Sequence, residues 1–303
     1  MISIFRIGTR GSPLALAQAR MVATALRDTH GWGPDAIEIV PITTTGDMVR
    51  DRPLAEIGGK GLWTKELDAC LTDGRTDISV HSMKDVETIR PPELEIAATL
   101  ERAHVCDRLI GADSIDALPP GARVGTSSPR RAAQILARRP DLVIVPFRGN
   151  VETRLKKLAL GEADATLLAS AGLDRLGRHD TGVVLDDFLP APAQGAVGIE
   201  VRSDDSKSRA IVAAIDHRET HLCILAERRL LEGLGGTCRS PIAALARLHD
   251  DEIHLRAEIV APDGREIQEG ESRFPAGDTE APLALARLLL DRASPALRAL
   301  FSG

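Results

Sequence analysis

Ile7-Gly8-Thr9-Arg10-Gly11-Ser12-Pro13 ends a strand-like run and opens a segment rich in alanine and leucine. The same punctuation returns at Val124-Gly125-Thr126-Ser127-Ser128-Pro129, again before a helix-like segment. Serine followed by proline is typical of a helix start, because serine caps the free amides and proline fits the first turn. The two stretches therefore predict two strand–turn–helix units built on one plan.

Two further features repeat in the same order after each of these turns. A strand-like run ends in Val-Pro at 37–41 and again at 142–146. A Gly-x-x-Asp step then precedes an apolar run, at 74–77 and at 161–164. Three matched features favour duplication over chance resemblance, although such punctuation is common. Alternating strands and helices predict an α/β fold with two β/α domains that flank a cleft.

The rest of the chain supplies a linker, a returning strand and a third part. Residues 99–105 are expected to link the first domain to the second, and 196–201 reads as a strand that returns to the first. After a helix at 218–231, three strand-like runs and a helix over 281–300 predict a small α+β domain with an antiparallel sheet. The predicted domains are 1–100 with 196–215, 101–195, and 216–303.

Composition limits the classes of protein that need consideration. The 303 residues are 43% hydrophobic, enough for two or three domain cores. No apolar run approaches membrane length and the start lacks signal-peptide features, so we expect a cytoplasmic protein without membrane contact. A net charge of −6 with 5 Phe, 2 Trp and no Tyr argues against nucleic-acid binding. Four cysteines without C-x-x-C spacing fit free thiols, so we predict neither disulfides nor a metal site.

His81-Ser82-Met83-Lys84-Asp85-Val86 follows an apolar strand-like run that stops abruptly. Open α/β sheets place their chemistry at strand ends that face a crevice. An ammonium beside a carboxylate holds the carboxylate ionised, ready to move protons or to face a developing cation. For an isolated Lys-Asp pair, an ordinary surface turn is the simpler interpretation.

Arginines gather at the predicted helix starts, where they oppose the helix dipole. A bound anion would offset that cost, because free amides and guanidinium groups converge on it. Any one of these arginines is more simply a solvated side chain, but together they favour a site for a small polyanionic ligand. The set comprises Arg10, Arg130, Arg131, Arg148 and Arg154.

Two glycine-rich loops carry further candidate residues. Gly58-Gly59-Lys60-Gly61 lacks the glycine spacing and the Ser/Thr of a P-loop, and a flexible loop with one lysine is the alternative. Cys238 lies among glycines next to Arg239, and a neighbouring cation favours the nucleophilic thiolate. An incidental loop cysteine is the alternative there.

The turns at 7–13 and 124–129, the run at 81–86, the loop at 58–61 and the arginines at 130, 131, 148 and 154 resemble the porphobilinogen deaminase (hydroxymethylbilane synthase) family. Gln194-Gly195-Ala196 and Cys238-Arg239-Ser240-Pro241-Ile242 add to this resemblance, which runs from Ile7 to the C-terminal domain. The resemblance implies two domains similar to periplasmic anion-binding proteins and a third that carries the cofactor. It implies a monomer that condenses four porphobilinogen molecules head to tail, with release of ammonia, to hydroxymethylbilane. It also implies a dipyrromethane cofactor attached through a thioether to Cys238.

The resemblance further implies roles for individual residues. The catalytic set is Asp85, Lys84, Arg10, Arg148, Arg154 and Arg175. The cofactor-binding set is Cys238, Lys84, Asp85, Ser82, Thr126, Ser127, Ser128, Arg130, Arg131 and Asn150. The substrate-binding set is Arg10, Ser12, Gln18, Lys60, Trp63, Arg148, Arg154, Arg175 and Gln194.

Four loop positions depart from the family's usual residues, and none of these changes removes a charged or nucleophilic group. This chain has Glu87 where the family commonly has proline and Trp63 where phenylalanine is more frequent. It has Ala193 and Thr237 where glycine is usual. They put the local loop geometry in question more than the activity.

Two other functions are weighed against this interpretation. A non-enzymatic anion receptor would have a signal peptide or tether and would not need Cys238. The effector domain of a transcription regulator would bring a helix-turn-helix with a basic face, whereas residues 1–60 read as strand–helix–strand.

Overall fold

The structure is a computed structural model that describes residues 4–48, 63–237 and 240–301. The chain divides into two compact units, called unit 1 (1–103 with 196–221) and unit 2 (104–195 with 222–303). Within the described residues, no helix is long and apolar enough to cross a membrane.

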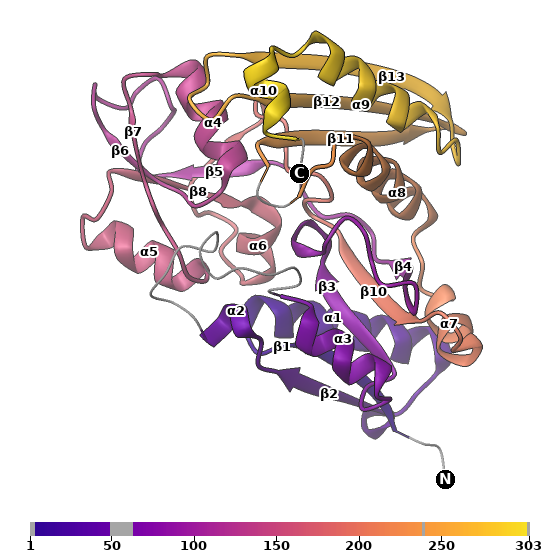
Figure 1. Cartoon of the computed structure of the whole chain (residues 1–303). Helices are drawn as coiled ribbons and strands as arrows, with labels where there is room; N and C mark the ends of the chain where they lie inside the picture. The colour runs from indigo at the N-terminus through magenta and orange to yellow at the C-terminus, as the bar shows by residue number, and fades with distance from the viewer. Residues whose placement is uncertain (1–3, 49–62, 238–239, 302–303) are drawn as a thin grey trace. The chain divides into compact units, whose positions relative to one another are not determined.

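Unit 1 is built on a five-stranded sheet of order β2-β1-β3-β10-β4 (Figure 1). Its strands are β1 (Phe5–Arg10), β2 (Ile37–Ile42), β3 (Ile78–Ser82), β4 (Leu94–Thr99) and β10 (Val197–Arg202). β1 runs parallel to β2 and β3, whereas β10 lies antiparallel between β3 and β4. The expected return of the chain at 196–201 into the first sheet is confirmed.

The helices of unit 1 begin and end where the sequence provides caps. The elements are α1 (Pro13–His30), η1 (Pro34–Ala36), α2 (Thr45–Met48), α3 (Lys65–Thr72), the 3₁₀ helix η2 (Met83–Asp85) and α7 (Ser206–Ala213). Ser12 caps α1 by accepting from the Ala15 amide, and Gly31 ends it in the left-handed conformation that favours glycine. Val22 and Leu26 of α1 are fully buried in one core with Ile7 and Ile78 of the sheet.

Unit 2 contains a second five-stranded sheet, of order β7-β6-β8-β5-β9. Its strands are β5 (Asp107–Ile110), β6 (Arg123–Gly125), β7 (Val143–Val145), β8 (Ala165–Ala169) and β9 (Val183–Leu185). β6 runs parallel to β7 and β8, and β5 lies antiparallel between β8 and β9. Order and direction match the first sheet strand for strand, as the repeated turns predict.

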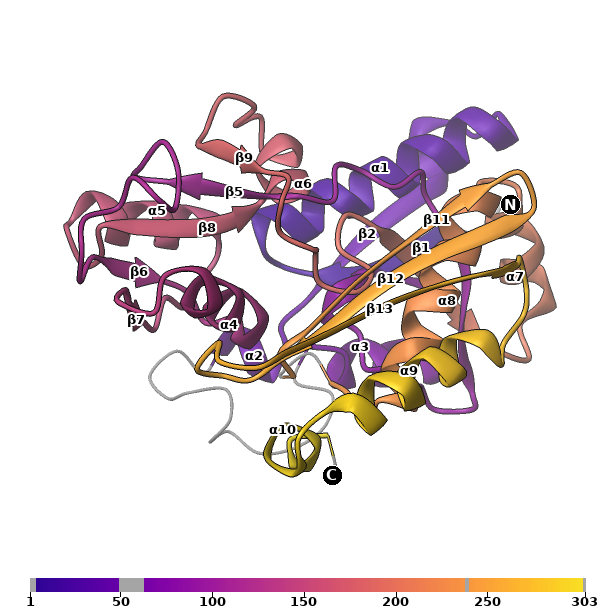
Figure 2. The ribbon, with the colours of Figure 1, turned by 90° about the horizontal axis from the view of Figure 1, so that it is seen from above.

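The remainder of unit 2 is a three-stranded antiparallel sheet with its own core (Figure 2). These strands are β11 (Ile242–His249), β12 (Glu252–Val260) and β13 (Ile267–Pro275). The helices of unit 2 are α4 (Pro129–Arg138), α5 (Val151–Ala159), α6 (Ser170–Arg175), α8 (Arg218–Gly233, entering from unit 1), α9 (Ala281–Arg292) and α10 (Pro295–Ala299). Leu230, Ile259 and Leu289 are fully buried where α8 and α9 meet this sheet.

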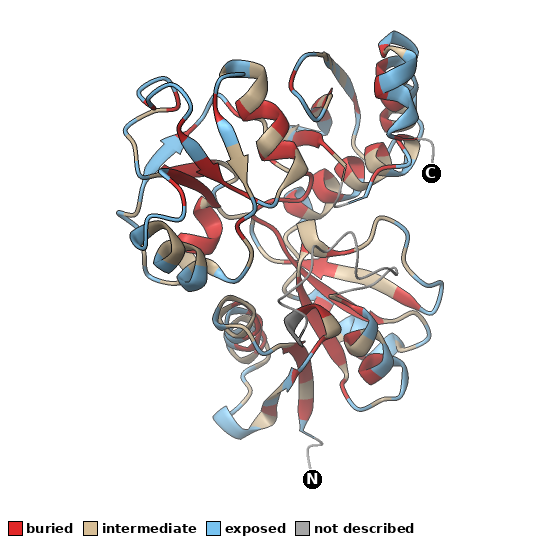
Figure 3. Ribbon diagram, turned by 60° about the vertical axis from the view of Figure 1, so that its left-hand side comes forward, coloured by how far each residue is buried: buried red, intermediate tan, exposed pale blue. Residues whose placement is uncertain are grey.

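The predicted α/β class, with two β/α sheets and a small α+β part, is confirmed. Many of the buried residues lie on the strands of these sheets (Figure 3). The single helix expected over 281–300 is wrong. Ser294 caps a separate helix there, and Pro295 has no amide to continue α9. The three domain boundaries drawn from the sequence stay predictions.

Candidate functional site

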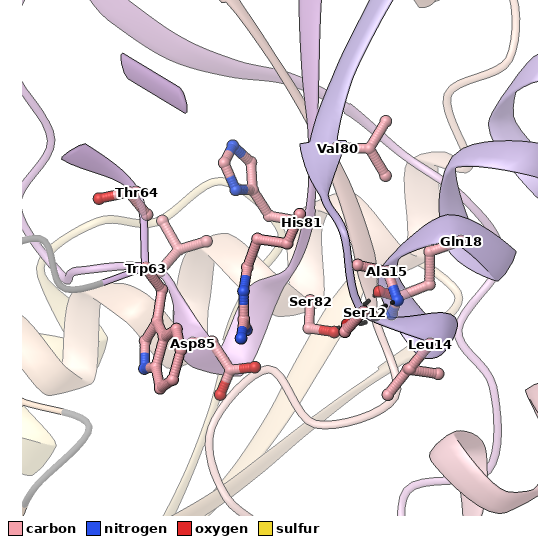
Figure 4. A pocket seen from close by; sticks show the side chains of 12 residues that line it. Ser12, Leu14, Ala15, Gln18, Trp63, Thr64, Val80, His81, Ser82 and Asp85 are labelled. Atoms are coloured by element: carbon pink, nitrogen blue, oxygen red, sulfur yellow. Dashed lines mark hydrogen bonds between the residues drawn. The ribbon is translucent and has the colours of Figure 1, made fainter. Parts of the chain in front are cut away.

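A polar pocket lies in unit 1 where the turns after β1 and β3 meet (Figure 4). The two strands are parallel neighbours, so their carboxyl ends lie at the same edge of the sheet. Six residues of the predicted site line this pocket: Arg10, Ser12, Gln18, Trp63, Ser82 and Asp85. The pocket also includes Thr64 and His81, for which the sequence suggested no role.

The placement of Asp85 follows from the way β3 ends. Ile78 and Val80 are buried in the sheet, and η2 then turns the chain so that Asp85 faces the pocket. Met83 is buried beneath this turn, and a Cβ built on Gly198 would lie 2.0 Å from the Met83 Sδ. A larger residue at 198 would therefore require the Met83 side chain to shift beneath the turn that presents Asp85. Lys84 is half-buried and lies outside the group that lines the pocket.

Hydrogen bonds and one ring contact fix the walls of the pocket. The Gln18 amide nitrogen donates to the Ser82 hydroxyl at 2.8 Å, and that hydroxyl lies 3.0 Å from the Gln18 amide oxygen. The Arg10 guanidinium carbon lies 3.9 Å from the centroid of the Trp63 ring. Such cation–π stacking orients the guanidinium without using its N–H donors. The pocket thus offers an oriented cation and a carboxylate to one small ligand.

The turn after β6 in unit 2 carries the three predicted hydroxyl residues. Ser128 Oγ accepts from the Arg131 amide at 3.4 Å and caps α4, as its place before Pro129 predicts. Ser127 Oγ donates to the Phe147 carbonyl at 2.7 Å, and Thr126 Oγ1 accepts from the Ser128 amide at 3.1 Å. These bonds shape a tight turn at the start of α4.

Arg130 and Arg131 are buried and share the carboxylate of Asp107. Arg131 Nη2 lies 2.6 Å from Asp107 Oδ1, and Arg130 Nη2 lies 2.7 Å from Oδ2. Burial is the main cause that lowers the pKa of Arg130, and the charge of Asp107 opposes it. Glu258 acts on Arg130 as a second, more distant carboxylate, since Gln134 bonds both Arg130 Nη1 and Glu258 Oε1. Sequence reasoning found both arginines but not the carboxylate between them.

Three more predicted arginines lie in unit 2. A buried Nη1 of Arg148 and a buried Nε of Arg175 have no hydrogen-bond partner within the described residues. Arg175 Nη2 donates to the Gly195 carbonyl at 2.6 Å, and burial lowers the pKa of Arg175 to about 10. Arg154 Nε donates to the Gly149 carbonyl at 3.0 Å. Unpaired buried donors are costly in a protein, and they suit an anionic ligand.

Asn150 and Gln194 have defined structural contacts. Asn150 Oδ1 accepts from the Thr153 amide at 2.9 Å and caps α5. Gln194 is buried, and its Nε2 donates to Asp107 Oδ1 at 2.9 Å and to the Val105 carbonyl at 2.7 Å. Gln194 therefore joins the cluster around Asp107. Lys60 and Cys238 lie outside the described residues, and their roles stay predictions.

The structure gives a contact or a backbone conformation for each of the four residues that depart from the family pattern. Trp63 stacks on Arg10. Glu87 Oε2 accepts from the Thr64 hydroxyl at 2.8 Å and from Arg90 Nη1 at 2.9 Å. Ala193 has φ of 62°, a left-handed conformation that favours glycine. The Thr237 amide donates to Ser240 Oγ at 3.1 Å.

Fold and pocket together define a duplicated α/β protein whose unit 1 has a polar pocket lined by a carboxylate and an arginine. Residues 5–210 match the family model described as porphobilinogen deaminase, dipyromethane cofactor binding domain. Residues 221–291 match the porphobilinogen deaminase C-terminal domain. The chain belongs to the porphobilinogen deaminase family.

Curated relatives agree over nearly the whole chain. A porphobilinogen deaminase of Sphingopyxis alaskensis is 55% identical over 98% of this chain and 96% of that protein. One of Paracoccus denitrificans is 52% identical over 91% of this chain and 90% of its own length. Among solved structures, the periplasmic VFT2 domain of BvgS from Bordetella pertussis is 16% identical with a TM-score of 0.41, covering 70% of this chain and 86% of that chain.

Proposed function

We propose that this protein condenses four molecules of porphobilinogen head to tail, with release of ammonia, into the linear tetrapyrrole hydroxymethylbilane. Family membership over nearly the whole chain supports this function. The observation that carries it is the pocket in which Asp85 and Arg10 face the same ligand space.

The charge of the substrate explains the number of arginines. Each pyrrole of the growing chain brings two carboxylates, so negative charge accumulates with every condensation. Guanidinium groups bind carboxylates through paired N–H donors and stay charged at any working pH. We propose that Arg10, Arg148, Arg154 and Arg175 bind these acetate and propionate groups.

Asp85 is the proposed catalytic carboxylate. Loss of ammonia leaves a cation on the substrate pyrrole that is about to be joined, and a carboxylate already oriented in the pocket stabilises that charge as it develops. The same carboxylate accepts and returns protons of the amine and of the pyrrole nitrogen. Lys84 lies beside Asp85 in η2 and is the neighbouring cation of the proposed catalytic carboxylate.

Unit 2 provides residues that fit a dipyrromethane cofactor. The orphaned donors on Arg130, Arg148 and Arg175, with the neighbouring Arg131, suit its four carboxylates. When bound, this cofactor supplies a covalent anchor that makes each condensation a local event. We propose that Cys238 holds it through a thioether, while Ser127, Ser128 and Asn150 shape the turns around its acidic groups.

Intact-protein mass spectrometry tests both the cofactor and the function. The purified enzyme is expected to weigh more than its sequence by one dipyrromethane, and Cys238→Ser to match its sequence mass. Asp85→Ala is expected to fold normally and to lose turnover, measured as hydroxymethylbilane formed from porphobilinogen. Near-normal turnover of Asp85→Ala would contradict its role.

The same measurement separates this function from a non-enzymatic anion receptor. A receptor would show the bare sequence mass and would bind porphobilinogen without consuming it. We also propose that the enzyme is cytoplasmic, as the sequence predicts, and works as a monomer, as the family resemblance implies. Light scattering behind a sizing column tests the oligomeric state.

A further inference from the structure

Behind the wall of the unit 1 pocket lies a buried charge network centred on Arg90. Its side chain is 9% exposed, and all five of its N–H donors are used. Two donors meet Glu200 at 2.8 and 3.0 Å, and one meets Asp68 of α3 at 2.6 Å. The remaining two meet Glu87 at 2.9 Å and the Thr64 hydroxyl at 3.3 Å. No predicted role of the site includes any of these residues.

The network reaches the pocket through two residues that line it and through the turn that carries Asp85. Thr64 lines the pocket and directly follows Trp63, the ring that stacks on Arg10. Glu87 lies two residues after Asp85, on the turn that η2 begins. His81 also lines the pocket, and its Nε2 lies 3.1 Å from Glu200 Oε2. One guanidinium thus fixes the Trp63 wall, the Asp85 turn and the floor at His81 relative to one another.

The charges of the network favour a single fixed geometry. Burial opposes ionisation of Glu200, but His81 and Arg90 outweigh it and lower the pKa of Glu200 to about 2. Burial raises the pKa of Asp68, which Arg90 only partly offsets. The N–H donors of a planar guanidinium point in fixed directions, so they reach these oxygens only when the oxygens lie in matching positions. An ammonium has three donors and lacks that planar geometry.

We propose that Arg90 and Glu87 are positioning residues for substrate binding, which hold Trp63 against Arg10 and set its distance from the Asp85 turn. The proposal rests on the proposed function, because its kinetic part uses porphobilinogen as substrate. Glu87 is the position where the family commonly has proline, so this bond between Glu87 and Thr64 is a feature of this chain. Its consequence is expected in substrate affinity rather than in the chemical step.

Matched variants separate positioning from stability. Glu87→Ala removes the acceptor for Thr64 and Arg90, whereas Glu87→Gln keeps an oxygen there. Arg90→Lys replaces the planar guanidinium and its five donors with an ammonium that has three. Arg202→Lys is the control, because Arg202 binds the carbonyls of Leu71 and Thr76, at and just beyond the end of α3, and does not line the pocket.

In steady-state kinetics, Glu87→Ala and Arg90→Lys are expected to raise the KM for porphobilinogen about tenfold, with kcat within about twofold of the parent. Glu87→Gln is expected to restore most of the affinity, and Arg202→Lys to lower Tm with KM unchanged. If folded Glu87→Ala and Arg90→Lys both kept the KM of Arg202→Lys, the proposal would be overturned.

A second readout needs no turnover. In a Trp32→Phe background Trp63 is the sole tryptophan of the chain, so its fluorescence reports this wall alone. Glu87→Ala is expected to shift its emission to longer wavelength and increase quenching by acrylamide, while Arg202→Lys changes neither. An unchanged emission in Glu87→Ala would reject the positioning of Trp63. A shifted emission with unchanged KM would reject the role in substrate binding. An inactive parent enzyme would refute the proposed function, and the emission comparison would still decide the positioning of Trp63.

Discussion

Arg130 and Arg131 differ from Arg148 and Arg175 in what their guanidinium groups already bind, although all four belong to unit 2 and the family resemblance implies a role in the site for each. Arg131 directs Nε and Nη2 to Asp107 and Nη1 to a backbone carbonyl. A buried nitrogen of Arg148 and one of Arg175 have no partner within the described residues. Arginines that look alike in the sequence therefore divide into a pair tied to the Asp107 carboxylate, of which Arg130 Nε alone lacks a partner, and a pair with no ion pair within the described residues.

Removal of Asp107 is the strongest test of this contrast. Asp107→Ala leaves two buried guanidinium groups without their carboxylate, and breaking such a pair costs about 3–5 kcal/mol. We expect a large fall in the free energy of unfolding in urea, together with loss of activity. Asp107→Asn, which keeps one acceptor oxygen, is expected to fall between the parent and the alanine variant. A stable, folded Asp107→Ala protein would show that the pair needs no structural partner.

The second test reverses the expected sign for stability. Arg148→Met removes a buried donor that has no partner within the described residues, so Tm is expected to stay the same or rise; Arg175→Met also loses its Nη2 bond to the Gly195 carbonyl, so its Tm is expected to stay about the same. Turnover of porphobilinogen is expected to fall about a hundredfold in kcat/KM, because the carboxylates lose a charged partner. Arg131→Met is the matched contrast and is expected to lower Tm. Equal losses of Tm in all three variants would show that Arg148 and Arg175 stabilise the fold as much as Arg131 does.

Glu200 extends the comparison to unit 1, where its carboxylate is held by Arg90 and His81. Burial opposes its ionisation, yet these partners lower its pKa to about 2 from an ordinary value of 4.5. A depressed carboxyl pKa adds stability above the ordinary value, and this stability is lost as pH falls towards the folded pKa. Between pH 5 and 3.5 the loss from this group alone is about 1 kcal/mol.

Urea unfolding at the two pH values measures this effect. Glu200→Gln is expected to be less stable at pH 7 and to lose less stability than the parent between pH 5 and 3.5. An identical pH dependence in both proteins would show that other carboxylates dominate acid unfolding.

Local chemistry made part of this structure predictable from the sequence. Ser12 and Ser128 cap helices as expected, because a serine before proline acts through amides only three residues away. The repeated turns predicted two sheets of one plan, and strand order and direction match in both. The position of Asp85 at the end of β3 followed from an apolar run that stops at a polar turn.

The pairing of buried charges could not be predicted in the same way. Asp107 lies 23 residues from Arg130, and Glu200 lies 110 residues from Arg90. No periodicity or cap indicates which carboxylate a distant guanidinium will meet, because that choice depends on how strands cross in the sheet. The sequence therefore indicated the arginines of the site without showing which were already bound.

Ala193 carries the smallest expected effect and lies beside Gln194, which joins the Asp107 cluster. Its left-handed φ of 62° disfavours a residue with a Cβ by about 1 kcal/mol. Its amide donates to buried Glu227 at 2.5 Å, which holds the turn in place. Ala193→Gly, the residue usual in the family, relieves the strain but adds freedom to the unfolded chain.

The net gain for Ala193→Gly is expected to be about 0.5 kcal/mol, read as a higher urea midpoint at unchanged slope. Asp250→Gly is the control, because Asp250 also has a positive φ, of 55°, in a turn. Aspartate tolerates that conformation better than alanine, so its gain is expected to be smaller. Since Glu227 and not the methyl group holds the turn, activity is expected to stay at the parental level. A loss of stability in Ala193→Gly would instead mean that the buried methyl packs well enough to outweigh the strain.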